Sequence, residues 1–143
     1  NGGARDLNLE AVNYGDELMS YGGSSLQLLG LGENGHIGFN EPPCLLDSRS
    51  RVVRLSRATK LQNAFAFNND VNRVPCYAIT LGIQEILSAD VIYLVVIGKE
   101  KSEVFDSLIH EPVSKSLPAS WLKNHENITI WVDRAAYGSN KLY

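Results

Sequence analysis

The sequence predicts a single-domain α/β protein with a mainly parallel sheet that is covered by helices on both faces. Short apolar runs of the kind that form buried strands alternate along the chain with segments of helical periodicity. A glycine-rich loop follows directly on the first of these runs, and in open parallel sheets the loops after the strands hold the functional groups. The 143 residues are enough for one hydrophobic core and require no second domain.

The first helix is expected to begin after Asp6 or Asn8, because a short polar side chain at the N-cap accepts hydrogen bonds from the free backbone N–H groups. Apolar residues then recur at helical spacing, and the two glycines at 22–23 supply a stop. Residues 25–31 form a nearly continuous apolar run that fits a buried parallel strand. The glycine-rich loop at 30–42 comes next.

The rest of the chain keeps the alternation of strands and helices. Apolar runs with high strand propensity predict strands, and apolar residues at helical spacing predict the helices between them. Further strands are expected at 51–55, 76–81, 91–97 and 128–132, and further helices at 59–67, 83–88 and 99–109.

The composition is that of an ordinary globular protein, with 44% hydrophobic and 20% charged residues. A net charge of -3 and a pI near 5.6 argue against a nucleic-acid partner, because binding to phosphates needs a basic surface. No long apolar stretch or secretory signal is seen, so we expect no membrane partner and a cytoplasmic location. Cys44 and Cys76 lack metal-ligand spacing and are expected to be free thiols.

The loop contains Gly30-x-Gly32-x-x-Gly35, which matches the short dinucleotide-binding pattern. That pattern needs a helix that starts within the loop, yet two prolines at 42–43 interrupt the chain soon afterwards. The acidic residue expected after the next strand is also missing, because the strand at 51–55 is followed by serine and arginine. The context therefore argues against a nicotinamide site.

The same loop places His36 close to Glu41. A carboxylate can orient an imidazole whose pKa lies near physiological pH, and such a pair suits proton transfer. The structural alternative is that His36 bonds only to the backbone and Glu41 caps a turn. For an isolated histidine the structural interpretation is the more frequent one, so the assignment depends on the surrounding residues.

Those surrounding residues carry a specific resemblance. Residues 29–42, LGLGENGHIGFNEP, resemble the signature of the glucosamine-6-phosphate deaminase family. Residues 69–82 resemble the stretch downstream of that signature, residues 98–101 its phosphate-proximal turn, and residues 118–125 a late helix of the family. The resemblance extends in order over essentially the whole chain.

The resemblance implies a modified doubly wound fold, of which this chain is the C-terminal part. It implies the conversion of glucosamine 6-phosphate and water to fructose 6-phosphate and ammonia. The implied partner is therefore a small sugar phosphate, and no metal or organic cofactor is implied. A homo-oligomer is possible, since relatives are found as monomers, dimers and hexamers.

The resemblance also implies roles for single residues. His36 is the ring-opening acid/base, which moves a proton between the ring oxygen and the anomeric hydroxyl, and Glu41 holds its tautomer and orientation. Asn34 is the third catalytic position. Gly35 and Lys101 are substrate-binding positions, with Lys101 at the family's phosphate lysine.

Two positions depart from the family pattern. Many members carry an aspartate where this chain has Asn34, which can still form hydrogen bonds but has no charge with which to raise the pKa of His36. Phe65 lies where members carry an arginine for the substrate phosphate, and an aromatic ring cannot replace a bidentate guanidinium.

The chain begins at Asn1 without an initiator methionine, which looks like an interior start. In the family, the base that acts on C1 and C2 of the opened sugar is an aspartate in the half that precedes this region. We therefore expect that the N-terminal half is lacking here and that the isolated 143 residues are inactive.

Three other functions stay open on the sequence. The Phe65 substitution makes the epimeric galactosamine 6-phosphate a plausible substrate. The 6-phosphogluconolactonases have a related loop, although the Phe-Asn-Glu-Pro at 39–42 favours the deaminase. The same fold also serves as a non-catalytic sugar-phosphate sensor, against which the retention of His36 and Glu41 argues.

Overall fold

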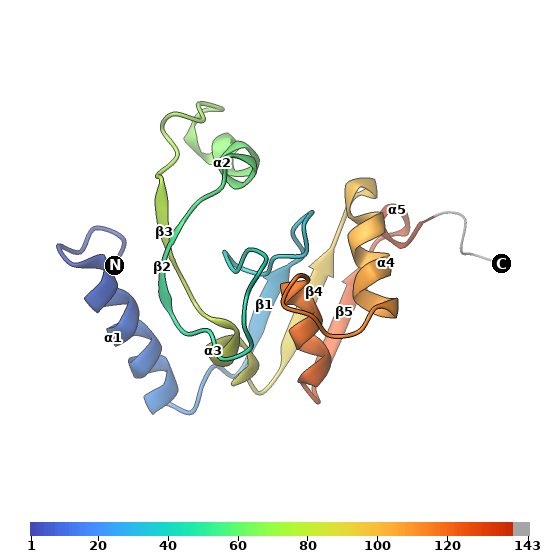
Figure 1. The fold of residues 1–143 in the computed structure, drawn as a ribbon, viewed down its shortest axis with the longest axis horizontal. Helices are drawn as coiled ribbons and strands as arrows, with labels where there is room; N and C mark the ends of the chain where they lie inside the picture. Colours follow the sequence, from blue (N-terminus) through green and yellow to red (C-terminus); the bar gives the residue numbers. More distant parts are fainter. Residues whose placement is uncertain (139–143) are drawn as a thin grey trace.

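A three-stranded parallel sheet in the order β1-β4-β5 forms the centre of the computed structural model, which describes residues 1–138 (Figure 1). Its strands are β1 Gln27–Gly30, β4 Ile92–Val96 and β5 Ile128–Val132. Leu29 pairs with Leu94, which pairs with Ile130, so one apolar row crosses the sheet. The predicted α/β class with a mainly parallel sheet is confirmed.

The predicted helices occur at the expected places in the chain, although several of their boundaries differ from the prediction. Asp6 caps the first helix by accepting from the N–H groups of Asn8 and Leu9, both at 3.0 Å. The α-helices are α1 Leu7–Ser20, α2 Arg57–Asn63, α3 Ile83–Leu87, α4 Ser102–His110 and α5 Arg134–Tyr137, and the 3-10 helices are η1 Ala64–Phe67, η2 Lys99–Lys101 and η3 Pro118–Asn124. The sequence did not predict α5. Within residues 1–138, no helix has the length and apolar character needed to cross a bilayer.

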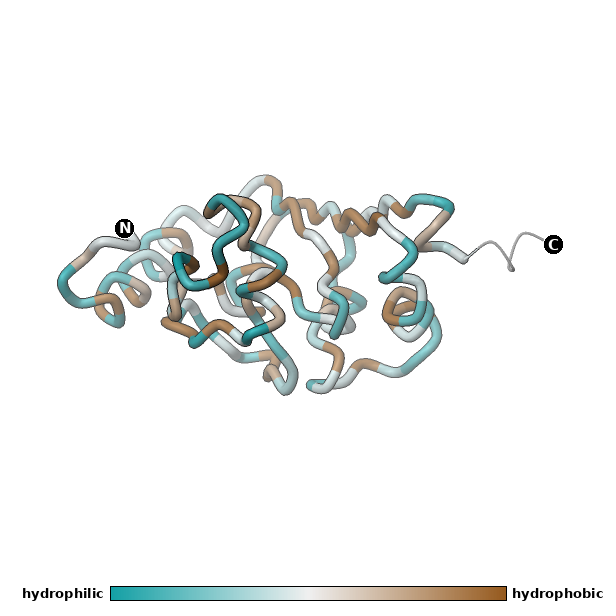
Figure 2. Tube along the Cα trace, turned by 90° about the horizontal axis from the view of Figure 1, so that it is seen from above, coloured by the Kyte–Doolittle hydropathy of each residue, from teal (hydrophilic) through white to brown (hydrophobic). Residues whose placement is uncertain are grey.

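Among the described elements, α3, α4, α5 and η3 cover one face of the parallel sheet, whereas the sequence predicted helices on both faces. Figure 2 shows the strands along one border of the molecule, with most of the chain on one side of them. On the covered face Leu94 is fully buried against residues of α3, α4 and η3. On the opposite face Leu28, Tyr93 and Trp131 are exposed by 64%, 36% and 60%. Alternate residues of a strand point to opposite faces, so these side chains form an apolar surface of their own.

The strands β2 Arg51–Arg54 and β3 Tyr77–Thr80 correct the expected topology. They do not join the parallel sheet but pair with each other as an antiparallel ribbon, with Arg51 opposite Thr80. A strand inside a parallel sheet is buried on both faces, whereas β2 carries an arginine at each end. The ribbon packs against α1, and its far end carries α2 (Figure 1).

A buried carboxylate fixes the ribbon to the helices beneath it. Glu85 of α3 is fully buried and accepts from the N–H groups of Ser50 at 3.0 Å and Gly82 at 3.1 Å. Arg49 approaches it with Nε at 3.3 Å. Gly15 of α1 leaves the necessary room, because a Cβ there would lie 2.9 Å from Glu85 Oε1. A buried charge is tolerated only where partners stabilise it. The contacts of Glu85 therefore hold α1, α3 and the start of β2 in fixed positions relative to one another.

Adjacent leucines of β1 give a test of the two sheet faces. Leu29 is 7% exposed and Leu28 is 64% exposed. Leu29→Ala should lower the free energy of unfolding of the 143-residue chain by about 2–5 kcal/mol, because it leaves a cavity in the core. Leu28→Ala on the open face should change it by about 0.5 kcal/mol or less. Urea denaturation measures both, and equal losses for the two variants would contradict the assignment of faces.

Candidate active site

The loop after β1 is held in place by the end of the ribbon. Asn40 is fully buried, and its Nδ2 donates to Ile37 O at 3.1 Å and to Leu81 O at 2.8 Å. The backbone N–H of Phe39 donates to Thr80 Oγ1 at 3.1 Å. No helix starts between residues 31 and 50. The dinucleotide pattern thus lacks its helix, as the prolines predicted.

Two glycines of the loop have structural reasons to be glycine. Gly35 has φ +82°, and a Cβ there would lie 2.2 Å from Leu117 Cδ1. Its N–H donates to Gly32 O at 3.0 Å and its carbonyl accepts from Ala119 N at 2.9 Å. A Cβ on Gly32 would lie 2.3 Å from the imidazole of His36, so that glycine lets the ring lie against the backbone. A substrate-binding role for Gly35 stays a prediction.

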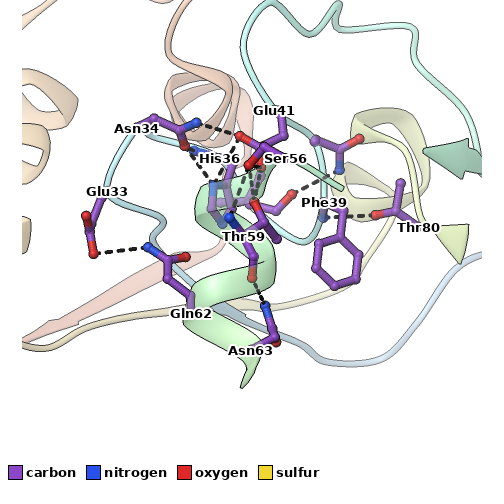
Figure 3. Close-up of polar contacts among 12 residues, drawn as sticks. Glu33, Asn34, His36, Phe39, Glu41, Ser56, Thr59, Gln62, Asn63 and Thr80 are labelled. Atoms are coloured by element: carbon purple, nitrogen blue, oxygen red, sulfur yellow. Dashed lines mark hydrogen bonds and ion pairs between the residues drawn. The ribbon is translucent and has the colours of Figure 1, made fainter. Parts of the chain in front are cut away.

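His36 and Glu41 are joined through Asn34 rather than by a direct hydrogen bond (Figure 3). Asn34 Oδ1 lies 2.7 Å from His36 Nδ1, and Asn34 Nδ2 donates to Glu41 Oε2 at 2.5 Å. The direct distance from His36 Nδ1 to Glu41 Oε2 is 3.6 Å. The structure therefore brings together all three predicted catalytic positions, with the amide between the imidazole and the carboxylate.

This arrangement defines the tautomer of His36. The amide Nδ2 of Asn34 faces a carboxylate, which can only accept, so Oδ1 faces the ring. A carbonyl oxygen also only accepts, so Nδ1 of His36 carries the proton and Nε2 of the neutral ring keeps its lone pair. Within residues 1–138, Nε2 makes no hydrogen bond. It is free to exchange a proton with a ligand in the adjoining depression, which is lined by Glu33, Asn34, His36, Ser56, Ala58, Thr59 and Gln62.

The surroundings favour a neutral imidazole and an ionised carboxylate. Burial lowers the pKa of His36 from its ordinary value of 6.5, the charge of Glu41 opposes this, and the charge of Lys101 adds to it. Burial acts to raise the pKa of Glu41, but hydrogen bonds from Thr59 and Asn34 outweigh it and leave that pKa below its ordinary value. The pair is thus set as a neutral base beside a fixed anion.

Thr59 and Ser56 at the start of α2 are site residues that the sequence did not reveal. Thr59 Oγ1 donates to Glu41 Oε1 at 2.5 Å, and Ser56 Oγ lies 3.5 Å from the same oxygen (Figure 3). Ser56 also caps α2 by accepting from Thr59 N at 3.1 Å. The spacing of Ser56 and Thr59 could have shown the N-cap, but not the contact with a residue of a distant loop.

Lys101 lies beside this cluster because β4 neighbours β1 in the sheet. Its side chain is 15% exposed, and its Nζ lies 3.9 Å from Glu33 Oε1. The same carboxylate oxygen accepts from Gln62 Nε2 of α2 at 3.0 Å. Lys101 also borders an open depression at the carboxyl ends of the two strands, lined in addition by Leu28, Leu29, Gly30, Leu31, Val95 and Ile97. The structure thus places the predicted phosphate lysine close to His36.

Phe65 lies on η1, directly after α2, and 76% of it is exposed. It is therefore not a core residue of its helix, whereas Phe67 is partly buried. An exposed ring at this position contributes no positive charge. Among the described residues that line the His36 depression or the neighbouring one, Lys101 is the cation.

The described residues offer no set of metal ligands around this site. No group of three or more histidine, cysteine, aspartate or glutamate side chains gathers within residues 1–138. Cys44 is buried and Cys76 is exposed, and both are free. The chemistry that can be derived from these side chains is proton transfer at His36, with Lys101 as the nearby positive charge.

Known proteins resemble this chain in sequence over nearly its whole length. Residues 2–131 match the protein family described as glucosamine-6-phosphate isomerases/6-phosphogluconolactonase. A glucosamine-6-phosphate deaminase of Oceanobacillus iheyensis is 45% identical over 95% of this chain and 54% of its own length. Glucosamine-6-phosphate deaminase 1 of Bacillus subtilis is 43% identical over 95% and 56%. The chain spans about half the length of the curated relatives it matches.

Solved structures agree with the sequence relatives. A monomeric glucosamine-6-phosphate deaminase superposes with a TM-score of 0.91 at 43% identity, over 96% of this chain and 56% of the other. The 6-phosphogluconolactonase of Trypanosoma brucei gives a TM-score of 0.67 at 20% identity, over 98% and 57%, and shares the fold. The chain belongs to the family of glucosamine-6-phosphate isomerases and 6-phosphogluconolactonases.

Proposed function

We propose that this chain forms the ring-opening part of an amino-sugar phosphate deaminase that converts glucosamine 6-phosphate and water to fructose 6-phosphate and ammonia. The observation that carries the proposal is the linked set His36, Asn34 and Glu41, which leaves Nε2 of a neutral imidazole free. The relatives at 43–45% identity that bear the name of this deaminase support the choice of substrate class.

The geometry suits one particular proton transfer. Nε2 of His36 takes the proton of the anomeric hydroxyl and returns it to the ring oxygen as the bond between C1 and that oxygen breaks, which gives the open aldehyde. The ring becomes cationic between these two events. Glu41, ionised and linked through Asn34, stabilises that cation by its charge. The depression beside His36 would hold the sugar.

The phosphate of the substrate would be held near Lys101. This lysine follows β4 at the sheet edge where ligands of open α/β sheets bind, and its ammonium can act as a point charge toward phosphate. Phosphate would compete with Glu33, which now lies 3.9 Å from Nζ. Because Phe65 is exposed and uncharged, the phosphate would be bound more weakly than in a protein with an arginine at this position.

Later steps need groups beyond these. Moving a proton between C2 and C1 requires a base near these two carbons, and the chain spans about half of the length of its relatives. The isolated 143 residues are therefore still expected to be inactive. A cytoplasmic location remains a prediction.

The protein that contains this chain should release ammonia from glucosamine 6-phosphate. His36→Gln should lower the rate by about a hundredfold or more, because the amide cannot take up the proton, while substrate binding stays measurable by calorimetry. A coupled ammonia assay follows both variants, with galactosamine 6-phosphate as the second substrate. Binding of both sugars by the wild-type protein without any ammonia release would overturn the enzyme function.

The pH dependence follows from the lowered pKa of His36. Below pH 6.5 the unfolded chain takes up a proton at His36 before the folded chain does, so stability falls as the pH drops through this window. Nitrogen-detected NMR of the imidazole should show a midpoint below 6.5 in the folded protein. The unfolding free energy of His36→Gln should lack the pH dependence that wild type shows in this window. A midpoint above 6.5 would show that the charge of Glu41 outweighs burial.

A further inference from the structure

The carboxylate of Glu41 is held by two separate elements. Its Oε2 accepts from Asn34 of the loop, and its Oε1 accepts from Thr59 of α2, each at 2.5 Å. These two donors lie 25 residues apart in sequence and reach the carboxylate from different elements. The position of Glu41 therefore depends on both the loop and α2.

Thr59 is built into this contact. It is 2% exposed, and its hydroxyl lies 2.8 Å from Ser56 Oγ as well as 2.5 Å from Glu41. A carboxylate can only accept, so the hydroxyl proton of Thr59 goes to Glu41 and the Ser56 hydroxyl donates to Thr59. A chain of donors thus runs from the cap of α2 through Thr59 and Glu41 to Asn34 and His36. A hydroxyl that only stabilised the helix would not need to donate to the carboxylate.

We propose that Thr59 is a positioning residue, which fixes the carboxylate of Glu41 and makes the acid/base action of His36 depend on the seating of α2 against the loop. This inference rests on the proposed function, since it assigns a further residue to the same proton transfer. Without the Thr59 hydroxyl, Glu41 keeps Asn34 as its one close donor among the described residues, and the Ser56 hydroxyl, which then has no acceptor in Thr59, lies 3.5 Å from Oε1. Glu41 can then rotate away from the amide that links it to His36.

The charged groups that face this pair are few within residues 1–138. Glu41, Lys101 and Glu33 act on His36, and His36 acts on Glu41. Glu33 is itself tied to α2 through Gln62. A displaced α2 would therefore change two of the three charges that His36 senses.

The test compares Thr59→Val with Thr59→Ser in the protein that contains this chain. Valine keeps the branched shape but has no hydroxyl, and serine restores the donor. Thr59→Val should lower kcat for ammonia release about tenfold with little change in KM, because a hydrogen bond to an ionised group is lost. NMR of the side-chain carboxyl carbon of Glu41 should show titration at a higher pH than in wild type. Thr59→Ser should return both values toward wild type.

Asn63→Ala is the matched control. Asn63 Nδ2 donates to Thr59 O at 2.8 Å, so this variant weakens the same helix without touching Glu41. It should leave the titration of Glu41 unchanged. An unchanged titration in Thr59→Val, or an equal change in Asn63→Ala, would overturn the proposal.

The titration needs no substrate, so it separates the two hypotheses. If wild type releases no ammonia while Thr59→Val alone shifts Glu41, the proposed function fails and the positioning of Glu41 by Thr59 stands. If wild type is active and Thr59→Val keeps its full kcat, the positioning role fails and the proposed function stands.

Discussion

The parallel pairing of β1 with β4 determines where the chemical groups of this chain lie. Gly30 at the end of β1 pairs with Val95 near the end of β4, so the segments that follow the two strands leave the sheet at the same edge. One of these segments carries Asn34, His36 and Glu41, and the other carries Lys101. The core beneath them is the buried apolar face of the sheet, which packs on its helices. The imidazole of His36 and the ammonium of Lys101 therefore lie near the same edge of the sheet.

The antiparallel ribbon adds the second half of the arrangement. Its base is held by the buried carboxylate of Glu85, and its far end carries α2 to the loop after β1. Thr59 then reaches Glu41, and Gln62 reaches Glu33. The positions of the charged groups around the imidazole thus depend on α2, which follows a strand of the antiparallel ribbon and not of the parallel sheet. That dependence gives the site its ionised carboxylate despite the burial that opposes ionisation.

The sequence predicts the parts of this structure whose causes are local. Asp6 caps its helix through its own side chain, and the run at 91–97 contains β4. The prolines at 42–43 exclude the dinucleotide helix for a steric reason that needs no tertiary information. The linkage of His36 to Glu41 was expected from the family resemblance, although the intervening amide of Asn34 was not.

The remainder depends on contacts between distant segments. Strand propensity finds the residues of β2 and β3 but says nothing of their partners, so the antiparallel ribbon was missed. Thr59 reads as an ordinary helix residue, and only the folded chain brings its hydroxyl to Glu41. An aromatic residue such as Phe65 is often a core residue, and only the folded chain shows that 76% of it is exposed. Gly35 is required by its positive φ and by the close approach of Leu117. In the sequence alone, such a glycine cannot be distinguished from one that is required for ligand binding.

In the proposed reaction His36, linked to Glu41 through Asn34, opens the sugar ring. This role is tested by the rate at which the protein interconverts the α and β anomers of glucosamine 6-phosphate, measured by exchange NMR before any ammonia accumulates. Ring opening limits this interconversion, so wild type should accelerate it above the rate in buffer and His36→Gln should return it to that rate. Interconversion at the buffer rate by wild-type protein that is saturated with the sugar would contradict this role of His36.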